Sequence, residues 1–265
     1  YSPAYEYNIT KSVGLFLFLF CISMDFGCDL WYNIGKGGAA MGKYENVFFD
    51  LDGTLTDSGE GIINSVIYTL KHYGQSIPQR QSLYRFIGPP LEYSFAEYCG
   101  FDRERAHEAV SVYREYYADR GIFENAVYDG VPDMLAALKS AGYGIALATS
   151  KPEKFAVRII EYFSLGGYFD CICGADMDEH RAEKSEVLAY ALEKTGADPA
   201  RSVMIGDRKY DVEGAALFSI DCIGVTYGFG TREELTSAGA KYIADSPLDI
   251  KKLLVPKTLV FSDAV

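Results

Sequence analysis

Short apolar runs alternate with segments of helical periodicity along most of this chain, from about residue 44 to residue 250. The runs hold too few residues for helices and are bounded by glycine or polar residues, which is typical of strands buried in a parallel sheet. The predicted strands cover residues 47–49, 145–148, 171–173, 203–205 and, as the last clear one, 222–225. Helices are predicted over residues 132–139, 152–162, 184–196 and 212–217. This alternation predicts an α/β fold, in which helices cover both faces of a parallel sheet.

One long block interrupts the alternation between the first and second predicted strands. It carries only helical patterns, over residues 58–74, 82–86, 90–99 and 103–120. An insertion of this size has the character of a second subdomain rather than of a crossover. The sequence therefore predicts a core of residues 41–57 and 129–250, a helical cap subdomain of residues 58–128 and a C-terminal tail of residues 251–265.

Residues 1–40 do not share this pattern. The apolar run 13–22 is too short for an ordinary transmembrane helix, and no small-x-small cleavage site follows it cleanly. The chain starts at Tyr1, while Met41 directly precedes the first predicted strand. We therefore expect the functional domain to begin near Met41 and interpret residues 1–40 as an atypical leader, disordered or artefactual. The alternative interpretation is a membrane anchor built on the apolar run.

Composition narrows the class of protein. With 49% hydrophobic and 23% charged residues, the chain of 265 residues is ordinary for a soluble globular protein. The net charge of -12 argues against a partner that is a nucleic acid or an anionic membrane. The six cysteines show no paired spacing and the three histidines are scattered, so neither a disulfide framework nor a His-rich zinc site is expected. We expect a cytoplasmic protein, a monomer or homodimer, with no membrane association.

Two carboxylates follow the first predicted strand, where an open α/β sheet binds its ligands. Asp50 ends the strand, Asp52 lies two residues further on, and Gly53 permits the chain to curl so that both acids meet one substrate. An aspartate can act as a nucleophile toward phosphorus while its neighbour acts as general acid and base, and both attract a hard cation. The alternative is a solvated acidic turn.

Polar groups also follow the other strands. Thr149 and Ser150 lie between a strand and a helix, where hydroxyls and free N–H groups form an anion site or a plain N-cap. Asp207 and Asp211 follow a strand at a spacing that places both on one helical face, so both can approach one cation; the alternative is helix capping by Asp207. Lys184 opens a helix and is either a surface residue or the cation that offsets a phosphate beside a nucleophile.

At these positions the chain resembles the haloacid dehalogenase superfamily of phosphohydrolases, whose first motif is Asp-x-Asp-Gly-Thr. The resemblance covers roughly residues 44–249 and implies a Rossmann-like parallel sheet with an inserted α-helical cap. It implies Asp50 as nucleophile and Asp52 as acid and base. The phosphate-binding residues that it implies are Gly53 and Thr54 through their N–H groups, Thr149, Ser150 and Lys184, with Arg181 as a near neighbour that fits the motif less well. The implied cofactor is Mg²⁺, held by Asp50, Asp52, Asp207 and Asp211, the last acting through water or by holding Lys184.

Local cues resemble the branch of phosphoglycolate phosphatases and 5′-nucleotidase-like phosphatases, namely residues 86–91, 128–131 and 224–228. The expected partner is a small phosphorylated metabolite, with Arg85, Gly88 and Tyr93 as cap contacts; the alternative for this cap segment is a simple loop. The second aspartate, Asp52, disfavours dehalogenation, and among cap lysines only Lys71 could form the Schiff base of a phosphonoacetaldehyde hydrolase. A 5′-nucleotidase, a phosphosugar mutase, a membrane-tethered form of the enzyme and a non-catalytic binding protein on this fold stay open as alternatives.

Overall fold

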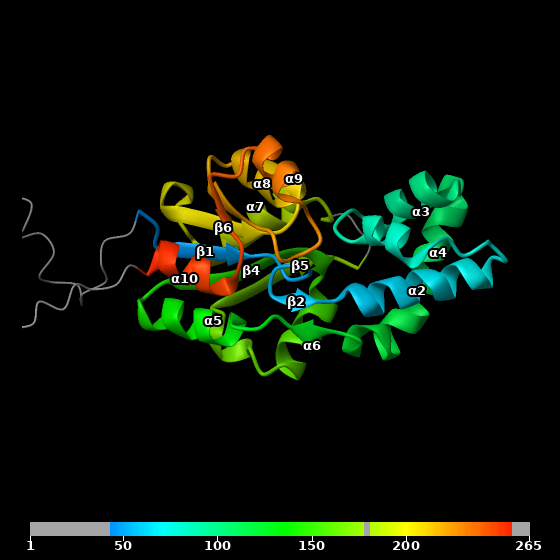
Figure 1. The fold of residues 1–265 in the computed structure, drawn as a ribbon, viewed down its shortest axis with the longest axis horizontal. Coiled ribbons are helices and arrows are strands. Elements are labelled where there is room, and N and C mark those ends of the chain that lie inside the picture. The colour runs from blue at the N-terminus through cyan, green and yellow to red at the C-terminus, as the bar shows by residue number, and fades with distance from the viewer. Residues whose placement is uncertain (1–42, 178–180, 256–265) are drawn as a thin grey trace, which may run out of the picture. The chain divides into compact units, whose positions relative to one another are not determined.

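The structure is a computed structural model that describes residues 43–177 and 181–255. The predictions for residues 1–40, and for the tail beyond residue 255, lie outside the described residues. At the centre is a six-stranded sheet in which every neighbouring pair is parallel (Figure 1). In spatial order its strands are β5 (Cys171–Ala175), β4 (Gly144–Pro152), β1 (Asn46–Phe49), β6 (Ser202–Gly206), β7 (Asp221–Val225) and β8 (Tyr242–Ala244). The predicted α/β class and parallel sheet are confirmed.

β1 is central and buried on both faces, which explains its unbroken apolar sequence. Val47 lies opposite Ile145 on β4 and Val203 on β6. Because successive side chains of a strand point to opposite faces, Val47 and Phe49 enter one hydrophobic cluster and Phe48 enters the other. The sheet therefore separates two apolar layers, and helices must cover both.

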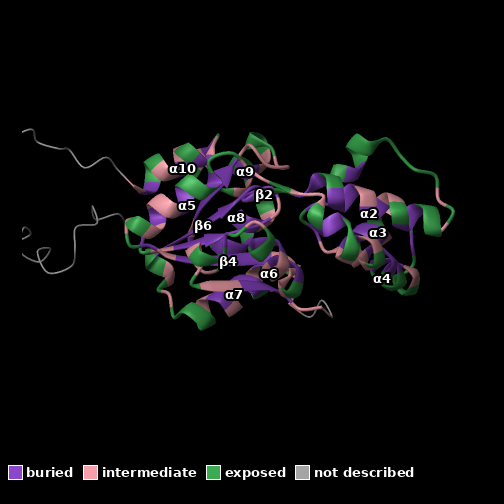
Figure 2. Ribbon diagram, turned by 90° about the horizontal axis from the view of Figure 1, so that it is seen from below, coloured by how far each residue is buried: buried purple, intermediate pink, exposed green. Residues whose placement is uncertain are grey.

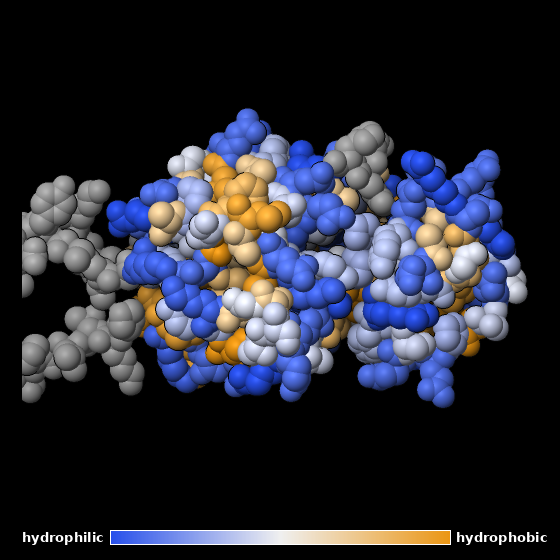
Figure 3. Space-filling model, turned by 90° about the horizontal axis from the view of Figure 1, so that it is seen from above, coloured by the Kyte–Doolittle hydropathy of each residue, from blue (hydrophilic) through white to orange (hydrophobic). Residues whose placement is uncertain are grey.

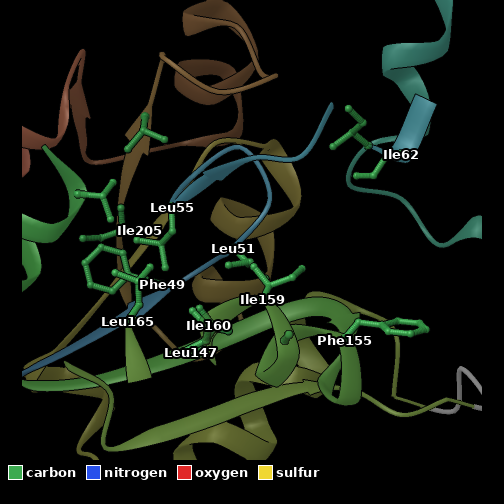
Figure 4. Close-up of a cluster of buried hydrophobic side chains, with 14 of the residues drawn as sticks. Phe49, Leu51, Leu55, Ile62, Leu147, Phe155, Ile159, Ile160, Leu165 and Ile205 are labelled. Atoms are coloured by element: carbon green, nitrogen blue, oxygen red, sulfur yellow. The ribbon is translucent and has the colours of Figure 1, made fainter. Parts of the chain in front are cut away.

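Three helices cover each face. The larger cluster is closed by α5 (Val131–Ser140), α6 (Glu153–Tyr162) and α10 (Pro247–Leu254). The smaller cluster is closed by α7 (Lys184–Thr195), α8 (Lys209–Ala216) and α9 (Arg232–Ala238). Figure 2 shows the buried strands between helices whose outer sides are exposed. In Figure 4, Phe49, Leu147 and Ile160 meet in the larger cluster, from β1, β4 and α6.

The cap lies between β2 (Thr56–Asp57) and β3 (Ala126–Val127), which pair antiparallel at its base. Its helices are α2 (Gly59–His72), α3 (Leu91–Cys99) and α4 (Arg103–Asp119), with 3₁₀ turns at Arg80–Phe86 and Gly121–Phe123. Phe95 is fully buried and contacts the rings of Phe86, Phe101 and Tyr113. The inserted helical cap is thus confirmed, with its own aromatic core.

The structure differs from the sequence-based elements in small, irregular segments. The segment predicted as a helix at 82–86 is a 3₁₀ helix, and β2 and β3 are too short to leave a periodic pattern. Residues 222–225 are not the last strand, because β8 follows at the sheet edge, where only Ala244 is buried. α10 ends at Leu254, which is buried, so residues 251–254 belong to a helix of the core and not to the predicted tail. Further 3₁₀ turns lie at Gly166–Tyr168 and Pro199–Arg201.

Hydrophilic residues cover most of the face shown in Figure 3, on the core and on the cap alike, with smaller apolar areas between them. Among residues 43–177 and 181–255, no helix combines the length and the apolar content needed to cross a membrane.

Candidate active site

The polar residues predicted to meet do so at the carboxyl ends of β1, β4 and β6. Asp50 follows β1, Thr149 lies near the end of β4, and Asp207 follows β6. Core and cap residues line one pocket at this edge. Of the predicted site residues, those that line it are Asp50, Asp52, Gly88, Thr149, Ser150, Lys184 and Asp211.

A tight turn after β1 brings Asp50 and Asp52 to the pocket. The Gly53 N–H donates to the Thr56 carbonyl oxygen at 2.8 Å, and the Thr54 N–H donates to that of Leu51 at 3.2 Å. Both N–H groups are therefore used inside the turn, which corrects the expectation that they bind phosphate. Gly53 has φ +81°, and a Cβ atom there would overlap the carboxylate of Asp207, so this position requires glycine.

Lys184 at the start of α7 is buried, and its Nζ lies 2.7 Å from Asp50 Oδ1 and 2.8 Å from Asp211 Oδ1. It also donates to the Ala148 carbonyl oxygen at 3.0 Å. Burial opposes the charged ammonium, but the charges of Asp211 and Asp50 outweigh burial and raise the pKa of Lys184. The surface interpretation of Lys184 is therefore wrong. Arg181, the near neighbour, instead donates to the Gly174 carbonyl oxygen.

Three buried carboxylates converge in the core. One oxygen each from Asp50, Asp207 and Asp211 lies within 4.8 Å of the other two. Asp207 Oδ2 accepts a hydrogen bond from the Phe229 N–H at 2.7 Å, while its Oδ1 is buried without a hydrogen-bond partner among the described residues. Burial, then the charges of Asp211 and Asp50, raise the pKa of Asp207. Burial also raises the pKa of Asp211 to about 6, with Asp50 adding and Lys184 opposing.

These observations fit a divalent cation. Three carboxylates face one lysine, and one of their oxygens lacks a partner, so a cation with oxygen ligands would relieve their repulsion. Asp207 is also wrapped by backbone: a Cβ at Gly228 or Gly230 would overlap it, so the chain approaches too closely for any other residue. The carboxylate of Asp52 is outside this group.

Thr149 is buried, and its Oγ1 accepts from the Lys151 N–H at 3.3 Å. α6 begins only at Glu153, and its N-cap residue is Pro152 with no side-chain cap. The plain N-cap interpretation of Thr149 is therefore wrong, and Thr149 lines the pocket together with Ser150.

Asp52 pairs with a lysine that the sequence did not single out. Lys151 Nζ lies 2.8 Å from Asp52 Oδ2 and donates to the Tyr117 hydroxyl of α4 at 2.7 Å. The available signal was the position of Lys151 directly after Thr149-Ser150. Tyr117 left no such signal, because only the folded cap brings it to the core.

The cap contacts were predicted in part. Gly88 lines the pocket, but Arg85 stacks on Tyr98 at 4.3 Å and Tyr93 is 54% exposed, and neither lines it. The cap residues that line the pocket are instead Ile62, Phe86, Gly88, Pro89, Pro90, Leu91, Tyr113, Arg114 and Tyr117. Arg114 Nη1 also donates to the Met177 carbonyl oxygen of the core at 2.9 Å.

Residues 47–225 match the family described as haloacid dehalogenase-like hydrolase. A 5′-nucleotidase of Pseudomonas aeruginosa is 44% identical over 193 residues, 73% of this chain and 87% of its own. The tyrosine-protein kinase PtkA of Mycobacterium tuberculosis is 42% identical over 184 residues, 69% of this chain and 62% of its own. The crystal structure of a predicted phosphatase from Clostridium acetobutylicum superposes with a TM-score of 0.78 at 47% identity, covering 80% of this chain and 98% of that one.

The family match runs from β1 to the end of β7 and includes the cap and the carboxylate cluster. It confirms the resemblance drawn from the strand-end motifs. The chain belongs to the haloacid dehalogenase-like hydrolase family and is a phosphoric monoester hydrolase.

Proposed function

We propose that the chain is a Mg²⁺-dependent phosphatase that hydrolyses a small phosphorylated metabolite through an aspartyl-phosphate on Asp50. The observation that carries the proposal is the surroundings of Asp50. Its carboxylate lies 2.7 Å from the buried Lys184 and beside Asp207 and Asp211, and Asp50 lines the pocket. A nucleophile, a fixed cation and a cation-binding carboxylate pair are the parts that phosphoryl transfer needs.

In the first half of the reaction, an Asp50 oxygen forms a bond to phosphorus as the bond from phosphorus to the leaving oxygen breaks. Asp52 gives its proton to that oxygen, so an alcohol leaves. In the second half, Asp52 takes a proton from water as the water oxygen attacks phosphorus, which frees Asp50 and releases inorganic phosphate. Lys184 offsets charge on the phosphoryl oxygens, and the Thr149 hydroxyl donates to one of them.

Asp50, Asp207 and Asp211 would hold Mg²⁺ through one carboxylate oxygen each, and Asp52 stays a further predicted ligand. When bound, the ion neutralises charge on the phosphoryl group and on the nucleophile.

A nucleoside 5′-monophosphate is the second candidate substrate beside a phosphoglycolate-like metabolite. The cap wall of the pocket carries the rings of Phe86 and Tyr113 together with Arg114, a surface suited to a planar base with hydrogen-bond acceptors. The relative named 5′-nucleotidase supports the same choice. The cap selects substrates through a few such side chains, so the panel below decides between the classes.

The test is phosphate release by the full chain with and without Mg²⁺, on 2-phosphoglycolate, nucleoside 5′-monophosphates and hexose phosphates. We expect Mg²⁺-dependent release that is lost in Asp50→Asn, and phosphate on Asp50 in acid-quenched Asp52→Asn by mass spectrometry. Substrate consumed without phosphate release would favour transfer to another hydroxyl, as in a mutase. Activity that survives Asp50→Asn would overturn the proposed nucleophile, and a folded chain that binds no Mg²⁺ and releases no phosphate would favour a non-catalytic protein.

A further inference from the structure

Lys151 is a second buried lysine of the pocket, and no step described above uses it. Its side chain is 6% exposed. A buried ammonium is stable only with partners that replace water, and Lys151 has two on different parts of the molecule. One is the carboxylate of Asp52 in the core, and the other is the hydroxyl of Tyr117 in the cap.

The contact with Lys151 holds one carboxylate oxygen of Asp52 and leaves the other oxygen unpaired among the described residues. Oδ2 faces Lys151 at 2.8 Å, while Oδ1 is buried and has no hydrogen-bond partner among the described residues. Without Lys151 the carboxylate could turn about its χ2 angle, because that torsion is broad in aspartate. With Lys151 in place, Oδ1 keeps one direction in the pocket.

The cap end of this contact is equally well defined. The ring of Tyr117 stacks on Tyr113 with centroids 5.5 Å apart and meets the ring edge of Phe155, from α6, at the same distance. Nζ of Lys151 lies 4.6 Å from the centroid of the Tyr117 ring and also donates to its hydroxyl. Burial, and then the charge of Asp52, raise the pKa of Tyr117, so the phenol keeps its proton. Any movement of α4 away from the core removes this partner from Lys151.

We propose that Lys151 is a positioning residue that aims Asp52 at the leaving oxygen of the substrate, and that Tyr117 makes this aim depend on the closed cap. The inference rests on the proposed function, in which the leaving oxygen takes the electron pair of the breaking P–O bond together with the proton of Asp52. Lys151 touches neither reacting bond in this role. The rival role is direct binding of the phosphoryl group, since Lys151 lines the same pocket.

Leaving-group dependence separates the two roles. Phenyl phosphate releases a phenol of pKa about 10, as in tyrosine, and needs a proton donor. 4-Nitrophenyl phosphate releases a more acidic phenol and needs the donor less. The ratio kcat/KM reports the steps up to cleavage of that bond, whereas hydrolysis of the aspartyl-phosphate is common to both substrates. If Lys151 orients Asp52, its loss should therefore lower kcat/KM more for phenyl phosphate than for 4-nitrophenyl phosphate. If Lys151 binds the phosphoryl group, its loss should lower kcat/KM equally for both substrates.

The experiment measures kcat/KM of the Mg²⁺-loaded full chain and its variants with both substrates. We expect Lys151→Met to lower the value about 100-fold for phenyl phosphate and less than about 10-fold for 4-nitrophenyl phosphate, within the usual range for a general acid. Tyr117→Phe, which keeps the ring, should act in the same direction to a smaller extent, and Lys151→Arg should recover part of the loss. In an Asp52→Asn background, Lys151→Met should cost almost nothing more, because it acts through Asp52.

Equal losses with both substrates, or a full further loss in the Asp52→Asn background, would overturn the inference and assign Lys151 to phosphate binding. If Lys151→Met fails to fold, Tyr117→Phe and its combination with Asp52→Asn decide by the same criteria. Activity that survives Asp50→Asn would instead overturn the proposed function itself, which keeps the two failures apart.

Discussion

The proposed mechanism divides the site into a nucleophile half and an acid–base half, and the two are built differently. The nucleophile half, made of Asp50, Lys184, Asp207 and Asp211, comes from the core alone and sits on the sheet edge. The acid–base half, Asp52 and Lys151 with Tyr117, needs a side chain of the cap. The core can therefore hold its nucleophile half complete whether the cap is open or closed, whereas the acid–base half is complete only with the cap in place.

The halves also differ in charge. Three carboxylates face one lysine in the nucleophile half, and burial raises the pKa of two of them, Asp207 and Asp211. In the acid–base half one carboxylate faces one lysine. The nucleophile half therefore carries excess negative charge, which a bound metal cation would neutralise. The acid–base half is balanced without a metal cation.

The largest expected effect is loss of the nucleophile. Asp50→Asn should lower phosphate release about 10⁴-fold or more, because the amide of asparagine cannot replace the carboxylate that is proposed to form the covalent bond to phosphorus. The measurement is steady-state phosphate release with Mg²⁺ present. Glu193→Gln, an exposed substitution on α7, is the control and should change nothing. Residual activity within tenfold of the wild type would mean that the nucleophile half does not supply the nucleophile.

A glycine pair tests whether the turn between the halves must be this tight. Gly53 and Gly142 have similar φ angles of +81° and +87°, but a Cβ at Gly53 overlaps Asp207 and one at Gly142 meets nothing within 4 Å. Gly142→Ala should cost only backbone strain, about 1 kcal/mol of unfolding free energy, and no activity. Gly53→Ala should cost about 1–3 kcal/mol and lower kcat/KM about 100-fold. Denaturant unfolding and kinetics check both, and equal effects of the pair would contradict the overlap.

A third substitution tests the charge imbalance. Asp207→Asn should raise the melting temperature of the metal-free protein by about 2–4 °C, as expected for about 1 kcal/mol in a domain of this size, because it removes a buried carboxylate whose ionised form burial opposes and whose Oδ1 has no hydrogen-bond partner among the described residues. The same variant should lose the stabilisation that Mg²⁺ gives the wild type. Asp211→Asn is the matched control: it removes a partner of Lys184 and should lower the melting temperature. A lower melting temperature for Asp207→Asn, or a higher one for Asp211→Asn, would refute the imbalance.

The smallest expected effect concerns Asp221, a carboxylate that lies outside both halves of the site. Asp221, at the start of β7, accepts hydrogen bonds from Lys241, Lys43 and Tyr44. Burial opposes the ionised form of Asp221, but these hydrogen bonds outweigh burial and lower its pKa to about 2. A lowered carboxyl pKa adds stability that is full above pH about 4 and is lost as pH falls toward 2. Asp221→Asn should flatten the fall in unfolding free energy over this window. An unchanged slope would place the acid sensitivity elsewhere.

The sequence was sufficient for the nucleophile half and not for the acid–base half. Asp50 and Asp207 follow apolar runs that could only be buried strands, and parallel strands bring their carboxyl ends to one edge, so sequence order predicted spatial proximity. Lys151 in the core and Tyr117 in the cap are 34 residues apart, and no periodicity encodes where a cap helix meets the core.

The misses share a physical reason. Arg85 and Tyr93 were predicted to contact substrate because they flank the cap turn around Gly88, yet Arg85 stacks on Tyr98 and Tyr93 is 54% exposed. The N–H groups of Gly53 and Thr54 were expected to bind phosphate and instead close the turn. In each case the side chain or amide had a local partner, and only three-dimensional contacts reveal which partner a polar group takes.

The short pairing of β2 with β3 has a consequence for how this enzyme can evolve. Thr56 lies opposite Val127, so the chain leaves the core and re-enters it at neighbouring backbone positions. A segment whose two ends already touch can be exchanged for another of different length without separating the strands on either side, because closing a loop between adjacent ends is inexpensive. The cap could therefore be exchanged as a unit. Such an exchange would alter which molecules reach Asp50, while Lys184 and the carboxylates around Asp50 would keep their positions in the core.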